Sequence, residues 1–314
     1  MSAFLLKTIA SVSMLIDHIG AVFYAPLFFR WIGRVAFPIY AFLIAQGCKY
    51  TKNINKYLFR LGIFALISEI PFDLAFNSMS QNLCSNINFL RYTNIFYTLF
   101  LGVACIAVYE KLKVKKRQWL AIIPILFLPA ILLTNYLPDN SSVTPTTLAA
   151  IVMAAYTAGA LCFAYFLKES DVEVTLKKKI IPLLVAIPVI ITAGAFKTDY
   201  GMFGTGLIFV LYLANPQKII RQATVLAGAV IYLYAIKGSS IIRIYWDYID
   251  GVFTEVGSSI NWHSVWHTLF ALTSAVLILF YNGKRGRNIK WSFYAFYPVH
   301  IAVLVAIRFL LEKA

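Results

Sequence analysis

The chain has 314 residues, of which 61% are hydrophobic and only 13% are charged. A soluble domain of this length fills its core with much less apolar material, so most of the surface is expected to face lipid. The formal net charge of +15 lies in short clusters between apolar runs. This pattern excludes nucleic acid as the expected partner and favours a lipid bilayer.

The first apolar run covers residues 5–27 and contains Asp17 and His18. These two residues interrupt the apolar stretch that a signal peptide requires, and no small-residue cleavage site follows. We therefore expect a retained membrane helix with Asp17 and His18 near its middle.

Apolar runs of about twenty residues, the length that crosses a bilayer as a helix, recur to the end of the chain. About eleven such runs are expected, at residues 5–27, 30–48, 57–76, 92–111, 118–137, 145–167, 179–196, 202–215, 219–236, 262–281 and 291–311. The sequence thus predicts an all-α polytopic transmembrane helix bundle that forms a single domain, residues 1–314.

Loops rich in Lys and Arg alternate with loops that almost lack them. The basic loops are residues 49–56, 111–117, 168–179, 215–221 and 282–290. Basic loops stay in the cytoplasm, so we predict a cytoplasmic N-terminus and a multi-pass protein of the inner (plasma) membrane. An odd number of spans then places the C-terminus outside. The acidic and aromatic segment 237–261 is expected to form a short interfacial helix or a re-entrant segment.

Metal chemistry is not indicated. The four cysteines have no CxxC or metal-type spacing, and they favour neither a disulfide framework nor a zinc site. His263 and His267 have the spacing of a two-histidine metal pair, but no carboxylate motif accompanies them. Their neighbours Trp262 and Trp266 are more typical of a membrane interface, so no metal is predicted.

Ionisable residues inside apolar runs are the best candidates for a functional site, because a charge at the centre of a membrane helix costs about 3 kcal/mol or more. They are concentrated in the first four runs and the last one, which predicts that these helices converge on one polar cavity. The candidates, with the polar residues near them, are Asp17, His18, Arg34, Arg60, Glu69, Asn94, Asp199, Tyr297 and His300.

Structural interpretations compete with each functional one. Arg30 and Arg34 are also typical of anchors at a membrane interface. Glu69 precedes Pro71 and is equally suited to cover backbone groups freed by a helix kink. Consecutive helical residues point about 100° apart, so Asp17 is poorly placed to orient His18. The partner of His18 is therefore expected from another helix, with Asp199 and His300 as the candidates.

Several motifs resemble the TraX family of membrane proteins. They are LKTIASVSMLIDHIG (6–20), IGRVAFPIYAFLIAQG (32–47), KYLFRLGIFALISEIPFDLAF (56–76), TNIFYTLFLG (93–102), DYGMFG (199–204), YNGKRG (281–286) and FYAFYPVHI (293–301). The resemblance implies a transmembrane acyltransferase. The founding member is associated with N-terminal acetylation of a conjugative pilin, and the wider superfamily transfers acetyl groups from acetyl-CoA to sugars. Relatives place a histidine in an early helix, which corresponds here to His18.

On this resemblance, acetyl-CoA is the expected co-substrate and an amine is the expected acceptor, on a small molecule, a sugar or a peptide. Transfer needs a base for the amine proton and a group that stabilises charge on the thioester oxygen. His18 is the expected base, with Asp17 and His300 as the other catalytic residues; an acetyl-histidine on His18 or His300 is the alternative. The expected substrate and acetyl-CoA ligands are Arg34, Arg60, Asn94, Asp199, Glu69 and Tyr297.

Three other functions remain open at this point. A proton-coupled small-molecule transporter would use Asp17, His18 and Glu69 as a relay. A structural partner in pilus or envelope assembly would keep the same groups as packing features. An O-acetyltransferase would direct the same chemistry to the hydroxyl of a glycan or lipid.

Overall fold

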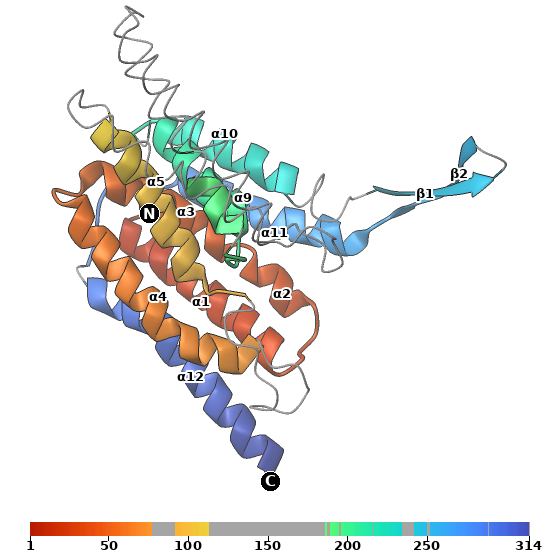
Figure 1. Ribbon diagram of the computed structural model, residues 1–314, viewed down its shortest axis with the longest axis horizontal. Helices are drawn as coiled ribbons and strands as arrows, with labels where there is room; N and C mark the ends of the chain where they lie inside the picture. The colour runs from red at the N-terminus through yellow and green to blue at the C-terminus, as the bar shows by residue number, and fades with distance from the viewer. Residues whose placement is uncertain are drawn as a thin grey trace, which may run out of the picture. The chain divides into compact units, whose positions relative to one another are not determined.

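The computed structural model (Figure 1) describes most of the chain. The described residues are 1–76, 92–112, 186, 189–194, 196–215, 217–233, 242–249, 252–287 and 289–313. The predicted spans 118–137 and 145–167 lie outside them. The chain forms two compact units: unit 1 is Met1–Lys49, Ile70–Asn88 and Val210–Ala314, and unit 2 is Tyr50–Glu69 and Phe89–Phe209. The single domain over residues 1–314 stays a prediction.

Helix α1, Ala3–Val22, opens unit 1. The side chain of Ser2 accepts a hydrogen bond from the backbone N–H of Leu5 and so caps its first turn. The helix ends at Val22 instead of near residue 27, because Tyr24 adopts a positive φ of 54° and Pro26 follows. The prediction that His18 lies near the middle of the first helix is therefore wrong: it lies in the last turns of α1.

The second predicted span, 30–48, is broken into two helices. Helix α2, Phe28–Gly33, is followed by α3, Ala36–Tyr50, and together they form one segment long and apolar enough to cross a membrane. Helix α2 packs on α1 so closely that a Cβ added at Gly33 would collide with the carboxyl group of Asp17. Glycine at this position allows the close approach on which the polar contacts described below depend.

Unit 1 also contains α10, Ile219–Val230, α11, Trp262–Leu279, and α12, Lys290–Lys313. Helix α11 packs on α10 and α2, and α12 packs on α1. Helices α1 and α12 run parallel, because Phe4 contacts Phe293 near their starts and Arg308 donates to the Val22 carbonyl near their ends. If both cross the membrane, the two ends of the chain lie on opposite sides of it.

An antiparallel hairpin precedes α11. Strand β1, Ile242–Ile249, pairs with β2, Val252–Ile260, and Ile249 lies opposite Val252. The expected interfacial helix is therefore wrong over 242–249 and 252–260, and the re-entrant alternative stays a prediction. The signal was present in the sequence: Asp250–Gly251, the two residues between the strands, are typical of a two-residue hairpin turn, and β-branched and aromatic residues flank them.

Unit 2 contains α5, Ile95–Leu112, with the first part of α4, Ile54–Phe76, and of α9, Gly201–Leu213. Helices α5 and α9 approach closely, because a Cβ added at Gly102 would lie 2.7 Å from the side chain of Ile208. A parallel bridge pairs Thr93 with Thr198 just before these two helices begin.

Four helical segments of the described residues are long and apolar enough to cross a membrane: Ala3–Val22, Phe28–Tyr50, Trp262–Leu279 and Trp291–Lys313. The described residues are helical apart from the β1–β2 hairpin and the loops. With these apolar segments, the chain is a helical membrane protein. Helices α9 and α10 coincide with two predicted spans but have only 13 and 12 residues. Such helices reach about 20 Å, less than the roughly 30 Å of a hydrocarbon core.

The contact at Gly33 gives a test of the α1–α2 packing. Gly33→Ala is expected to lower the free energy of unfolding by about 1–3 kcal/mol, because the added methyl group forces the helices apart. Gly228→Ala in α10 is the matched control, since a Cβ there meets nothing within 4 Å. The control should be neutral or stabilising by about 0.5–1 kcal/mol. Thermal unfolding of both variants in one detergent measures the difference, and equal midpoints would contradict the close contact.

Candidate functional site

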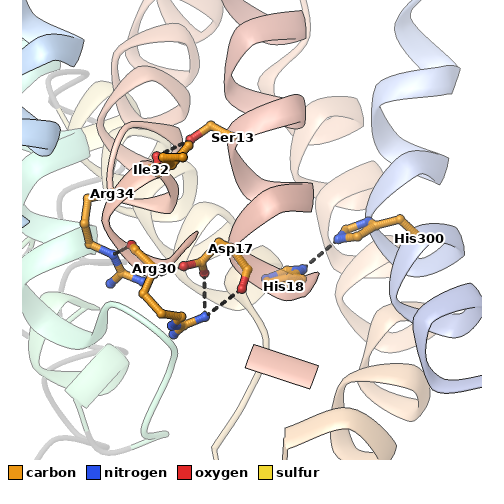
Figure 2. Close-up of polar contacts among 7 residues, drawn as sticks. All are labelled: Ser13, Asp17, His18, Arg30, Ile32, Arg34 and His300. Carbon is orange, nitrogen blue, oxygen red and sulfur yellow. Dashed lines mark hydrogen bonds and ion pairs between the residues drawn. The ribbon is translucent and has the colours of Figure 1, made fainter. Parts of the chain in front are cut away.

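Asp17 and His18 point to different neighbours from the last turns of α1. Figure 2 shows the Asp17 carboxylate directed at Arg30 and Arg34, and the His18 ring directed at His300. The divergence follows from the rotation of about 100° per helical residue. The sequence-based prediction that the partner of His18 comes from another helix is confirmed, and that partner is His300 on α12.

The Asp17 carboxylate forms ion pairs with both arginines. Its Oδ2 lies 2.9 Å from Nη1 of Arg30, and its Oδ1 lies 3.1 Å from Nη2 of Arg34. Arg30 also donates to the backbone carbonyl of Asp17 at 3.1 Å. The side chains of Asp17 and Arg34 are only 13% and 15% exposed. Within the described part of the chain, two arginines therefore share one carboxylate in a largely buried cluster.

The same region adds side-chain donors to carbonyl groups at the end of α2, where the Ile32 carbonyl also accepts from the Val35 backbone N–H at 3.3 Å. Nε of Arg34 donates to the Arg30 carbonyl at 3.0 Å, and Oγ of Ser13 donates to the Ile32 carbonyl at 2.5 Å. A break inside an apolar segment requires such partners, because the hydrocarbon supplies none. Arg34 thus has a clear structural use here besides any role toward a substrate.

The rings of His18 and His300 lie edge to edge in nearly one plane. Nδ1 of His18 is 2.6 Å from Nε2 of His300, the ring centroids are 4.9 Å apart, and the planes differ by 6°. The distance between the ring centroids equals the N–N distance plus the radii of the two rings. The two nitrogens therefore lie on the straight line that joins the two centroids. This arrangement is the best geometry for an N–H···N hydrogen bond.

Aromatic residues surround the histidine pair. Tyr297 is buried and lies edge-on to both rings, with centroids 5.8 Å from His18 and 5.7 Å from His300. Phe76 lies 5.3 Å from the His18 ring, and Phe296 is nearly parallel to His300 at 4.6 Å. Nδ1 of His300 donates to the Phe296 carbonyl at 2.7 Å. The pair is therefore enclosed on several sides, although His18 itself is only half-buried.

The position of His18 along α1 places the pair away from the basic end of unit 1. At the start of α1, Ala3 and Phe4 donate backbone hydrogen bonds to Lys284 and Arg285 in the basic loop. His18 lies about 22 Å along the axis from Ala3 but only about 6 Å from the end of the helix at Val22. If the basic loop faces the cytoplasm, the histidine pair lies in the outer part of the membrane.

Unit 2 holds a second polar cluster, formed by Glu69 of α4 and Asn94. Oε2 of Glu69 accepts hydrogen bonds from the backbone N–H of Asn94 at 3.2 Å and from its Nδ2. Nδ2 also donates to the Ala65 carbonyl, and Oδ1 accepts from the Phe96 N–H at 2.9 Å. Asn94 therefore caps α5 and joins it to α4. Polarising a substrate carbonyl would require this amide to exchange its partners.

Arg60 and Asp199 also belong to unit 2. The Arg60 guanidinium lies 5.8 Å from the Tyr57 ring centroid, and its buried Nε has no hydrogen-bond partner in the described part of the chain. The backbone N–H of Asp199 donates to the Thr93 carbonyl at 3.0 Å. Convergence of the polar residues of both units on one cavity stays a prediction.

The structure thus gathers the predicted residues into separate groups: His18, His300 and Tyr297; Asp17 and Arg34; Glu69 and Asn94. Sequence reasoning missed Arg30 as an ion-pair partner, although it lies one helical turn before Arg34. It also missed the Phe296 carbonyl, for which the spacing of one turn before His300 was the available signal. The described residues contain no group of three or more His, Cys, Asp or Glu placed to hold a metal ion.

The ion-pair cluster predicts a large stability effect. Asp17→Ala leaves two arginines without their carboxylate in a buried setting and is expected to cost about 3–5 kcal/mol. Glu312→Ala, which breaks the pair with Arg308 near the end of α12, is the control and should cost less than about 1 kcal/mol. Unfolding in detergent measures both, and similar losses for the two variants would contradict a special role for Asp17.

The Glu69–Asn94 contact predicts a stability effect as well. Asn94→Ala removes the cap of α5 and leaves the Glu69 carboxylate with fewer donors, so it should destabilise by about 2–4 kcal/mol. Asn55→Ala is the matched control, because Asn55 is exposed and, among the described residues, accepts from Lys111 alone. Its effect should stay within about 0.5 kcal/mol. Wild-type thermal stability of Asn94→Ala would show that the contact is not structural.

No solved structure matches the chain. A probable fimbrial assembly protein FimC, serogroup H1, from Dichelobacter nodosus is 25% identical over 321 residues, which cover 99% of this chain and 97% of the relative.

A family model described as TraX protein matches residues 2–214. The matched region contains Asp17, His18 and Arg34 together with Glu69 and Asn94, and the alignment with the fimbrial relative extends over α12 as well. Since the family match covers more than half of the sequence, the resemblance seen in the motifs is confirmed: the chain belongs to the TraX family.

Proposed function

We propose that this protein is a multi-pass inner-membrane acyltransferase that moves an acetyl group from cytoplasmic acetyl-CoA to an amine. The family is linked to pilin acetylation, and the fimbrial assembly relative carries a name from pilus biology. The N-terminal amine of a pilus subunit is therefore the preferred acceptor, and an amino sugar is the second.

The observation that carries this proposal is the hydrogen bonding of the two nitrogens of the His18 ring. Its Nδ1 is bonded to His300, and no described residue forms a hydrogen bond with its Nε2. An imidazole that is held at one nitrogen and open at the other suits a general base. The nearly coplanar partner and the aromatic surroundings fix its orientation, which acyl transfer requires.

The arginine cluster supports the same chemistry. Attack of an amine on a thioester places negative charge on the carbonyl oxygen, and fixed positive charge in a site that excludes water stabilises it. Arg30 and Arg34 both pair with Asp17, the neighbour of His18 on α1, which holds two guanidinium groups in this region. In this proposal Asp17 holds the two arginines in position. The role of Arg60 as a ligand of acetyl-CoA stays a prediction.

The decisive experiment uses the full chain purified in detergent. Free thiol and acetylated product are measured with acetyl-CoA and a panel of pilin N-terminal peptides, amino sugars and hydroxyl acceptors. His18→Ala should reduce turnover by about 10²–10⁴-fold while the protein stays folded, because the base is lost. His263→Ala is the matched control: it removes another membrane-segment histidine, which accepts from Trp31 and is not part of the pair.

Two results would count against the proposal. A folded His18→Ala variant with wild-type turnover would remove the histidine from the chemistry. A monodisperse wild-type protein that neither binds nor turns over acetyl-CoA with any acceptor would favour the transporter, and proton-coupled uptake into vesicles then becomes the measurement.

A further inference from the structure

His300 has a role that the acyltransferase proposal leaves open. Its two ring nitrogens belong to one chain of hydrogen bonds, from His18 Nδ1 to His300 Nε2 and from His300 Nδ1 to the Phe296 carbonyl. A carbonyl oxygen only accepts hydrogen bonds, so Nδ1 of His300 must carry a proton. In a neutral His300 ring, Nε2 is then the acceptor, and the proton in the His18–His300 bond belongs to His18.

We propose that His300 is a positioning residue that holds His18 as the tautomer protonated on Nδ1, so that Nε2 of His18 carries the reactive lone pair. This inference rests on the proposed function and adds which nitrogen acts and what selects it. The Phe296 backbone, through His300, thus determines the reactivity of a ring on a different helix.

The opposite proton arrangement is unfavourable in this setting. If His300 donated to His18, both nitrogens of His300 would be protonated and the ring would be a cation. It is buried with 6% exposure between Phe296 and Tyr297. The carboxylate of Asp17, on the adjacent face of α1, is already paired with Arg30 and Arg34, whose charges also disfavour another cation nearby.

The tautomer gives a balanced transfer step. The acceptor nitrogen forms a bond to the thioester carbonyl carbon, and its proton passes to Nε2 of His18. The positive charge of the resulting imidazolium is stabilised by its Nδ1–H bond to His300. The C–S bond then breaks, and the same proton passes to the departing thiolate, which yields the amide and free thiol and restores the neutral His18 ring.

Two substitutions separate this role from simple packing. His300→Phe keeps an aromatic ring beside Phe296 and Tyr297 but removes the acceptor. His300→Gln places an amide oxygen near the position of Nε2 and can still accept from His18. We expect kcat to fall about 10²–10⁴-fold in His300→Phe with little change in KM, and to recover by at least tenfold in His300→Gln. Equal kcat values in the two variants would overturn the proposal.

A second readout needs no substrate. The chain has only four histidines, so ¹⁵N-histidine labelling gives a spectrum in which His18 is assigned by its loss in His18→Ala. Wild type should show His18 protonated on Nδ1 alone, His300→Gln should keep that state, and His300→Phe should lose it. His263→Phe, outside the pair, should leave the His18 signal unchanged.

The two measurements distinguish the two ideas. The expected His18 tautomer without any acetyl transfer would leave the inference standing and count against the proposed function. Acetyl transfer by a protein whose His18 is protonated on Nε2, or whose tautomer is the same in His300→Phe, would overturn the inference and leave the proposed function standing.

Discussion

Hydrocarbon offers no hydrogen bonds, and the packing of α1 on α2 shows how the protein meets that constraint. The second membrane segment is broken between Gly33 and Ala36, and such irregular backbone requires hydrogen-bond partners from the protein itself. Ser13 donates to the Ile32 carbonyl, Arg34 donates to the Arg30 carbonyl, and Arg34 also pairs with Asp17. Gly33 makes the approach of α1 close enough for the contacts of Ser13 and Asp17. The break, the arginines and the aspartate therefore form one interdependent structure.

In this arrangement two consecutive residues of α1, Asp17 and His18, contact different helices. Asp17 faces α2 and pairs with its arginines, whereas His18 faces α12 and has one ring nitrogen with which no described residue forms a hydrogen bond. Because helical neighbours diverge by about 100°, one turn of helix serves two partners. The stability of the first contact fixes the rotation of α1, and this rotation determines where the His18 ring points. The orientation of the ring on one face thus depends on an ion pair on the other.

Much of the architecture could be predicted from hydrophobic runs. A helix that crosses lipid needs a run of consecutive apolar residues, and such a run can be seen in the sequence itself. The helices at 262–281 and 291–311 agree with the structure within a few residues. Pairings were harder: His18 and His300 are 282 positions apart, and no local pattern specifies their contact. The depth of His18 was misjudged because hydropathy continues past Val22, while Tyr24 and Pro26 end the helix. The capping role of Asn94 likewise depends on Glu69 from another helix.

The contact between α1 and α12 also has a consequence for biogenesis. Ribosomes deliver the chain from its N-terminal end, so α1 enters the membrane long before α12 exists. Until then His18 has no histidine beside it, and the backbone groups of Ala3 and Phe4 lack the loop that receives them. Helix α12 packs on α1 only after it has been synthesised and inserted. A nascent or truncated chain without α12 therefore lacks the paired imidazoles.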